Sequence, residues 1–445
     1  MKERVFRKIM GILIMMIPGA LFAQETVGVS AINSGDTAWV LISAALVLMM
    51  TVPALAMFYA GMVRRKNVLS TLYYSLGSAI VVSLLWVLFQ YSLTFGGKEL
   101  IPGVIGGLDK AFLENIGINS IYPTMPTVPE FAFSAFQFTF AAITVALISG
   151  AVVERMNFKA WMIFSVLWST FVYSPIAHMV WNPNGILAKM GVLDYAGGYV
   201  VEIASGVSAI TAALFIGERV RFKKEAMLPS NIPMVFIGAG LLWFGWFGFN
   251  AGSAGAANGM AANAFLTTNT AGAAAALAWL LLEWKRGGKP SLIGAVSGLV
   301  AGLVAITPAA GFVDAKASLV IGFVAGVLCY FMVVEVKKKL GYDDSLDVFG
   351  IHGMAGTWGI IANGLFANPK INPLGTGLFY GNSKQIITQV IGIVVVYGVS
   401  IIGTLAILNV MKFFVSLRVE PQEEIYGLDL VLHGGCWMLL SASNS

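Results

Sequence analysis

Long apolar stretches separated by short polar connections run along most of the chain. A helix needs about 20 apolar residues to cross a bilayer, and eleven stretches reach that length. The predicted spans are 36–62, 69–95, 128–153, 160–181, 196–217, 232–252, 260–283, 291–308, 317–335, 346–367 and 385–415. The pattern therefore predicts an all-α polytopic membrane protein with eleven transmembrane helices.

The composition agrees with the bilayer as the main solvent. The chain has 445 residues, of which 58% are hydrophobic and 11% charged, and 50 are glycine. A soluble protein of this composition could not cover its surface with polar groups. The net charge of +5 comes from short basic clusters between the apolar stretches. Such clusters indicate topology, so nucleic acid is not predicted as a partner.

Lys and Arg residues are distributed unevenly between the connections. Seventeen follow odd-numbered spans, Arg64, Arg155 and Arg219 among them, and six follow even-numbered spans. Because cytoplasmic connections carry the excess of positive charge, the chain is predicted to have its N-terminus outside and its C-terminus inside. We expect a multi-pass protein of the inner (cytoplasmic) membrane.

The N-terminal residues predict a signal peptide, with a basic start, an apolar core at 9–22 and Ala23 before Gln24. An uncleaved first membrane helix is the alternative interpretation. The predicted domains are a signal peptide at 1–23, a membrane domain at 24–418 and a cytoplasmic tail at 419–445.

Two ionisable residues inside predicted spans are the main functional candidates, since a charge in hydrocarbon costs at least about 2.5 kcal/mol. Glu202 follows Asp194 in the fifth span, and His352 follows Asp347 in the tenth. Eleven spans divide into five, five and one, and halves of five spans would form an inverted repeat with a central site. Each residue could instead be a buried structural group.

Aromatic residues near the outer ends of three spans form a second candidate site. The third span places Phe136 and Phe140 on one stripe, Trp181 ends the fourth, and Phe249 and Ser253 lie near the end of the sixth. Each is individually typical of packing or interfacial anchoring, but together they could bind a small cation through their ring faces. No catalytic, cofactor or metal motif occurs in the sequence, so an enzyme is not predicted.

Six segments resemble the ammonium transporter and Rhesus protein family, and the prokaryotic ammonium transporter branch fits best. They are YAGMVRRKN at 59–67, HMVW at 178–181, DYAGGYVVEIASG at 194–206, GWFGFNAGSAG at 245–255, DVFGIHGMAGTWG at 347–359 and GLDLVLHGG at 427–435. The resemblance extends from about residue 35 to about residue 435. It implies eleven helices, an inverted five-helix repeat, a pore through each subunit and a homotrimer in membrane lipid.

The resemblance also implies roles for the candidate residues. Trp181, Phe140 and Ser253 match an outer site that recruits ammonium, with Phe136 in the neighbouring wall. Phe140 and Phe249 match an aromatic gate beneath that site, and Asp194 matches a carboxylate that supports it without touching the ion.

The sequence departs from the family pattern at two places. His352 matches the second of two facing pore histidines, but Glu202 stands where the first is usual, as in some fungal members. The tail resembles one that couples subunits and meets PII-type signal proteins, but Gly435 replaces the usual glutamate. The final CWMLLSASNS matches nothing recognisable; it could come from a fused signalling module or from drift.

The predicted function is ammonium transport, by recruitment at the aromatic site, deprotonation, and passage of ammonia and the proton through an apolar pore. Ammonium differs from potassium of similar size in having directional N–H donors and a proton that can leave. Two alternatives stay open, an ammonium sensor that signals through its tail and a Rhesus-like facilitator of neutral gas. A PII-type protein or a fused signalling module is the expected partner at the tail.

Overall fold

The computed structural model describes residues 32–434, within which nine helical stretches are long and apolar enough to cross a membrane. They are Ser34–Met62, Arg65–Phe95, Glu130–Val152, Phe158–Lys189, Gly198–Ile216, Ile232–Gly252, Gly259–Gly287, Ala315–Leu340 and Lys384–Met411. The other two predicted spans hold α13 (Leu292–Ile306) and the joined helices η8 (Phe349–Gly353) and α16 (Met354–Phe366). The fold is thus a helical polytopic membrane fold. The predicted signal peptide and CWMLLSASNS lie outside the described residues.

The long stretches are built from shorter elements that follow one another. The first half contains α2 (Ser34–Met49), η1 (Met50–Leu55), α3 (Ala56–Met62), η2 (Arg65–Asn67), α4 (Val68–Leu85), η3 (Trp86–Gln90), α5 (Tyr91–Phe95), α6 (Glu130–Val152), α7 (Phe158–Trp168), η5 (Ser169–Tyr173), α8 (Ser174–Trp181), α9 (Ile186–Lys189), η6 (Gly198–Ile203) and α10 (Ala204–Ile216). The second half adds α11 (Ile232–Gly252), α12 (Gly259–Gly287), α14 (Ala315–Phe331), η7 (Met332–Val336), α15 (Lys337–Leu340), η9 (Leu378–Tyr380) and α17 (Lys384–Met411).

Polar side chains in the connections fix where the helices begin. Each accepts a hydrogen bond from a backbone N–H of the first turn, which a helix leaves without an internal partner. These N-caps are Asn33 on α2, Asn157 on α7, Asn231 on α11, Asn258 on α12, Ser291 on α13 and Asp314 on α14. The polar breaks that separate the apolar stretches therefore also stabilise the helix ends.

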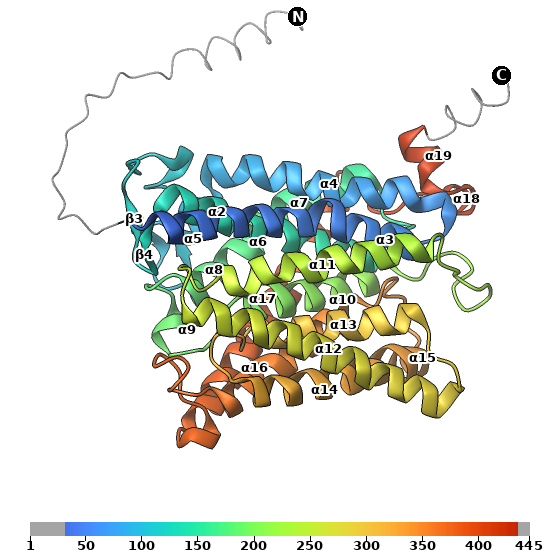
Figure 1. The fold of residues 1–445 in the computed structure, drawn as a ribbon. Coiled ribbons are helices and arrows are strands. Elements are labelled where there is room, and N and C mark those ends of the chain that lie inside the picture. The colour runs from blue at the N-terminus through green and yellow to red at the C-terminus, as the bar shows by residue number, and fades with distance from the viewer. Residues whose placement is uncertain (1–31, 435–445) are drawn as a thin grey trace, which may run out of the picture. The chain divides into compact units, whose positions relative to one another are not determined.

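The helices lie roughly alongside one another in a bundle, with connections at its two ends (Figure 1). One end, here called the strand end, carries two antiparallel strand pairs. They are β1 (Glu99–Ile101) with β2 (Ile105–Gly106), and β3 (Ile121–Tyr122) with β4 (Met125–Pro129), near the short η4 (Ala111–Leu113). The other end, here called the tail end, carries α18 (Pro421–Tyr426) and α19 (Leu428–His433). The described chain thus begins and finishes at opposite ends of the bundle.

Candidate functional site

A cavity of about 130 Å³ opens near the strand end of the bundle. Phe140 on α6, Trp181 at the end of α8 and Ser253 just after α11 line it, so the fold brings together residues from three predicted spans. The rings of Phe140 and Trp181 meet edge to face, with centroids 5.6 Å apart. Ser253 Oγ donates to the Phe249 carbonyl at 2.8 Å, which leaves its lone pairs free to accept.

Phe136 occupies a different position from the other aromatic candidates. It does not line the cavity and is fully buried behind Phe140, with the two ring centroids 4.9 Å apart. Its contact with Phe140 holds that ring in place, so Phe136 belongs to the supporting wall.

The floor of the cavity is an aromatic pair. Phe140 lies with its ring centroid 4.3 Å from that of Phe249, and both side chains are buried. Phe140 lines the cavity and Phe249 lines a second, inner pocket, so the contact between the two rings lies between the two spaces. Neutral rings at this position can block a hydrated ion and still move aside as side-chain rotamers change.

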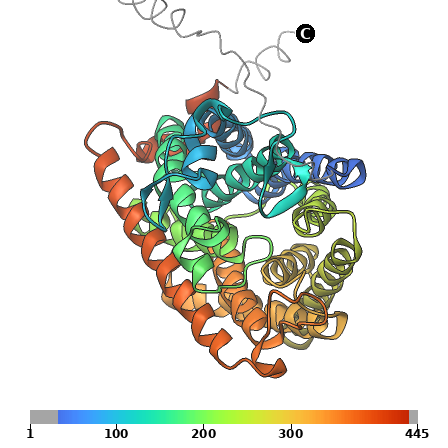
Figure 2. The same ribbon diagram turned by 90° about the vertical axis from the view of Figure 1, so that its left-hand side faces the viewer.

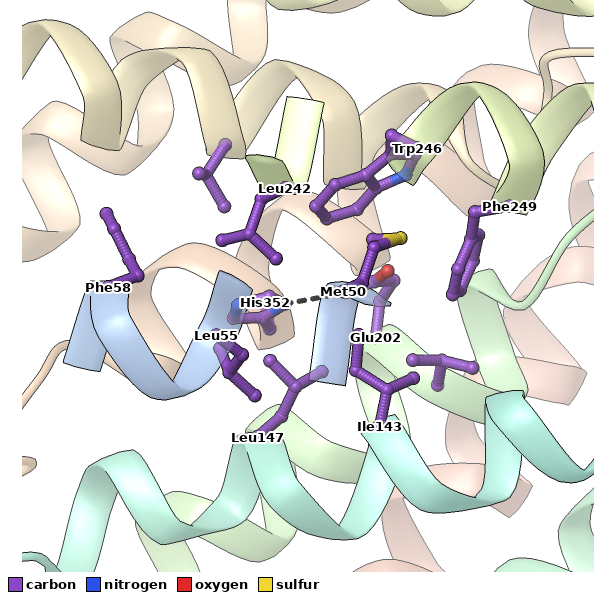
Figure 3. A pocket seen from close by; sticks show the side chains of 12 residues that line it. Met50, Leu55, Phe58, Ile143, Leu147, Glu202, Leu242, Trp246, Phe249 and His352 are labelled. Carbon is purple, nitrogen blue, oxygen red and sulfur yellow. Dashed lines mark hydrogen bonds and ion pairs between the residues drawn. The ribbon is translucent and has the colours of Figure 1, made fainter. Parts of the chain in front are cut away.

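The inner pocket is narrow and apolar except for two side chains (Figure 3). Its volume is about 10 Å³, roughly the space of one water-sized molecule. Glu202 and His352 point toward each other into it, and His352 Nδ1 lies 2.7 Å from Glu202 Oε2. Glu202 is 1% exposed and His352 is 5% exposed. The structure brings these two residues into direct contact, and their role in transport stays a prediction.

Glycines allow the two helices that carry this pair to cross closely. Glu202 lies on the π-helical turn η6 and His352 on the π-helical turn η8. A methyl group on Gly206 would lie 2.2 Å from the backbone nitrogen of Gly353, and one on Gly356 would lie 2.7 Å from the Cβ of Glu202. The backbones therefore touch where side chains would otherwise keep them apart.

Asp194 fixes the start of η6. Its Oδ1 accepts hydrogen bonds from the backbone N–H groups of Gly197 (2.8 Å) and Gly198 (2.7 Å), and its Oδ2 accepts one from Tyr199 (2.8 Å). Asp194 does not line the cavity, which agrees with a supporting position. Asp347 does not match it, because Asp347 pairs with Lys337 at 2.6 Å, and Asp344 accepts the Phe349 N–H that begins η8.

Two polar residues of the cavity were not singled out from the sequence. Gln137 and Tyr195 line it, and within residues 32–434 neither Gln137 Oε1 nor the Tyr195 hydroxyl has a hydrogen-bond partner. The place of Gln137 beside Phe136 on the same helical stripe was a usable signal. The sequence offered no such signal for Tyr195, because the position of this residue depends on how the loop after Asp194 folds back.

A cluster of buried charges lies at the tail end. Glu154 Oε2 pairs with Arg219 Nη1 at 2.7 Å and with Arg64 Nη2 at 3.1 Å, and Arg219 also pairs with Asp343. Burial by itself raises the pKa of Glu154, but the charges of Arg219 and Arg64 outweigh it and hold that pKa below its ordinary value. These pairs tie together connections that follow four different spans.

The tail folds back on the same end. Asp429 on α19 accepts backbone hydrogen bonds from Leu69 (3.0 Å) and Ser70 (2.8 Å) at the start of α4. The ring of His433 stacks on Tyr73, with centroids 4.3 Å apart. The tail therefore contacts the first residues of the second span.

Comparisons with known proteins agree on one family. The model described as Ammonium Transporter Family matches residues 38–436. A putative ammonium transporter of Methanothermobacter thermautotrophicus is 52% identical over 405 residues, which cover 90% of this chain and 98% of the relative. The crystal structure of Saccharomyces cerevisiae Mep2 is similar with a TM-score of 0.81 and 35% identity over 87% of this chain and 88% of that chain. A solved structure described as a sensor Amt protein is similar with a TM-score of 0.82 and 26% identity, over 90% of this chain and 98% of that chain.

Proposed function

This chain belongs to the ammonium transporter family, and we propose that ammonium binds in the aromatic cavity, loses a proton there and crosses the inner pocket as ammonia. The chain is therefore a transporter of ammonium and not an enzyme. The observation that carries the mechanism is the Glu202–His352 hydrogen bond inside an otherwise apolar pocket.

The cavity suits a small cation with N–H donors. The rings of Trp181 and Phe140 offer negative faces, while Ser253 Oγ, Gln137 Oε1 and the Tyr195 hydroxyl can accept N–H groups. Potassium has no donors to direct at these oxygens. Selection thus rests on hydrogen-bond direction and on the ability of ammonium to release a proton.

The inner pocket favours the neutral molecule. Beyond Phe249 its walls are hydrocarbon and sulfur atoms of residues such as Met50, Leu55 and Leu147. An intact cation would lose its hydration shell there, and the apolar walls offer few polar groups to replace it, so entry would cost several kcal/mol. Ammonia carries no charge and fits a space the size of a water molecule.

The proton released in the cavity follows through Glu202 and His352. In this proposal one proton is shared between Glu202 Oε2 and His352 Nδ1, which lie 2.7 Å apart. A proton that enters at one group can displace the shared proton to the other side. Ammonium import would then move one positive charge for each ammonia that crosses.

Ammonium-evoked current in proteoliposomes tests this mechanism. Wild-type protein is expected to give a current, whereas Glu202→Gln and His352→Ala should abolish it with ammonium binding at the aromatic cavity nearly intact. Glutamine keeps the shape of glutamate but carries no proton at accessible pH. A current of wild-type size from Glu202→Gln between pH 5 and 8, where histidine titrates, would reduce Glu202 to a structural group.

A sensor is the second candidate function, because the chain is similar to a sensor Amt protein and its tail contacts the start of α4. Ammonium binding without current or ammonia flux would favour it. Ammonia permeability without current would instead indicate a facilitator of neutral gas.

The proposed assembly is a homotrimer in the inner membrane, with eleven crossings, an inverted repeat and the tail end in the cytoplasm. Support comes from the helices α13 and η8–α16 at the two remaining predicted spans, and from the opposite positions of the described ends. Cysteines placed at Lys98 and Lys285 test the orientation. A membrane-impermeant thiol reagent applied outside intact cells should label the first and not the second. A PII-type protein is the proposed partner of the tail.

A further inference from the structure

A buried histidine outside the proton path stands one helical turn before Trp181. His178 lies on α8, the short helix that ends at the strand end of the bundle, which faces the viewer in Figure 2. Its side chain is fully buried. Nδ1 of the ring lies 2.9 Å from the Thr94 carbonyl oxygen, and Nε2 lies 3.0 Å from Glu99 Oε1. The ring therefore joins α8 to the end of α5 and to β1.

The two partners of the ring determine its charge. A carbonyl oxygen can only accept, so Nδ1 must carry a proton to bond with Thr94. Glu99 Oε1 also accepts the Gly103 N–H at 2.8 Å. The hydrogen bonds from His178 and Gly103 hold the pKa of the Glu99 carboxyl below its ordinary value. Facing an ionised carboxylate, Nε2 bonds only if it carries a proton as well. Both contacts are therefore satisfied when His178 is an imidazolium.

The surroundings of the ring agree with this positive charge. His178 lies in the last turn of α8, where the helix dipole favours a cation. Lys189 on α9 lies near Glu99 and favours its ionised form. Other elements that pack against α8 include β2, α5, η5 and η6. Their titratable groups are neutral phenols or have partners elsewhere: Tyr173 is a phenol with no charge at pH 7, Tyr91 donates to Glu130, Tyr199 donates to the Gln389 carbonyl, and Glu202 bonds His352. Glu99 is thus the anion that balances His178.

Contacts from outside α8 hold its last turn on both sides of Trp181. Asn182 Nδ2 donates to the Thr94 carbonyl at 3.1 Å, the same carbonyl that His178 reaches. The carbonyl of Gly103, in the loop closed by Glu99, accepts a backbone N–H at the start of α9 at 2.8 Å. The last turn of a helix has carbonyls without internal partners, so contacts of this kind set where the indole lies.

We propose that His178 is a positioning residue, an imidazolium between Thr94 and Glu99 that holds the Trp181 ring at the aromatic cavity. The inference rests on the proposed recruitment of ammonium there and adds to it a proton that is bound and not transported. When the ring loses its Nε2 proton, a lone pair faces the carboxylate and the contact with Glu99 is lost. The contact is thus present at lower pH and lost as the pH rises. Because a cation must lie within about 6 Å of the ring face, ammonium then binds more weakly.

Fluorine NMR of the full-length protein labelled with 5-fluorotryptophan tests the proposal, with the Trp181 signal identified by its absence from Trp181→Leu. Without ammonium at pH 7, wild type and Glu99→Gln should give the same Trp181 signal, because a glutamine amide can donate to Nε2 of a neutral ring. Glu99→Ala should displace or broaden that signal. Glu114→Ala changes an exposed carboxylate just after η4 and is the matched control. Nitrogen-15 NMR should show two ring protons on His178 in wild type and one in Glu99→Gln.

A rise in pH separates the variants further. In wild type the Trp181 signal should change over the pH range in which nitrogen-15 NMR shows His178 losing its second ring proton. The midpoint of an ammonium chloride titration of that signal, expressed as ammonium ion, should rise about fivefold over the same range, the size of one exposed cation–π contact. Glu99→Gln should show neither change. Glu99→Ala should have the raised midpoint at every pH.

Three results would overturn the proposal. One is a Trp181 signal in Glu99→Ala that matches Glu114→Ala, another is a singly protonated His178 ring in wild type at pH 7, and the third is a Glu99→Gln variant that follows the wild-type pH profile. The comparisons without ammonium need neither binding nor current. Failure of the proposed function, seen as a wild-type Trp181 signal that ammonium does not change, is therefore distinguishable from failure here.

Discussion

The helix crossing at Gly206 gives the sharpest test of the inner pocket. In Gly206→Ala the new methyl would lie 2.2 Å from the backbone nitrogen of Gly353, whereas ordinary contact begins at 3.4 Å. No side chain can yield, because the obstacle is backbone, so the helices must separate by about 1.2 Å. Rigid separation would stretch the 2.7 Å Glu202–His352 hydrogen bond to about 3.9 Å, beyond hydrogen-bond range.

The expected result is loss of most ammonium-evoked current in proteoliposomes, although Glu202 and His352 are both still present. Gly398→Ala is the matched control, since that glycine lies on the membrane helix α17 with nothing within 4 Å of the added methyl. Both variants should bind ammonium at the aromatic cavity as wild type does. If Gly206→Ala carried the same current as Gly398→Ala, proton transfer through this hydrogen bond would be refuted.

Further predictions concern other parts of the chain. Trp181→Leu should weaken ammonium binding by about 5- to 30-fold, or about 1 to 2 kcal/mol, measured as half-saturation of current, with the exposed Trp284→Leu as control. Deletion of residues 420–445 should lower transport while gel filtration shows an unchanged assembly; full activity would remove the tail from the mechanism. Glu154→Gln should lower the free energy of unfolding by about 3 kcal/mol at pH 7, because it leaves Arg219 buried beside one carboxylate fewer. The folded protein lowers the pKa of Glu154. This contribution to stability is therefore fully present at pH values above the ordinary glutamate pKa of about 4.3, and it is lost as the pH falls through the lower pKa of the folded state. Acid unfolding of wild type that matches Glu154→Gln at every pH would contradict this assignment.

The membrane helices were largely predictable from the sequence, because apolar length alone decides whether a segment can span. Predicted spans such as 36–62 and 232–252 agree closely with Ser34–Met62 and Ile232–Gly252. Glu202 and His352 could be singled out because ionisable residues are rare inside spans, whereas their facing positions were implied only by the resemblance to the family. Eleven crossings stay a prediction, because Leu292–Ile306 is short for a membrane helix.

Long-range partners could not be predicted in the same way. Arg64 and Arg219 entered the sequence analysis only as loop charges that set orientation. In the structure both meet Glu154, and Arg219 is only 6% exposed. Sequence spacing carries no information about such pairs, because residues 90 and 65 positions from Glu154 converge only after the helices have packed. The same holds for Tyr195, which reaches the cavity through a loop.

The closed contact between Phe140 and Phe249 also has a consequence for electrical driving force. A membrane potential does work only on charge that moves through it, at about 2.3 kcal/mol per elementary charge and 100 mV. Rotation of two neutral rings moves no net charge, so voltage cannot hasten the opening of this pair. If ring motion sets the turnover, the current should level off as voltage rises, and temperature should alter that plateau far more than the electric field does.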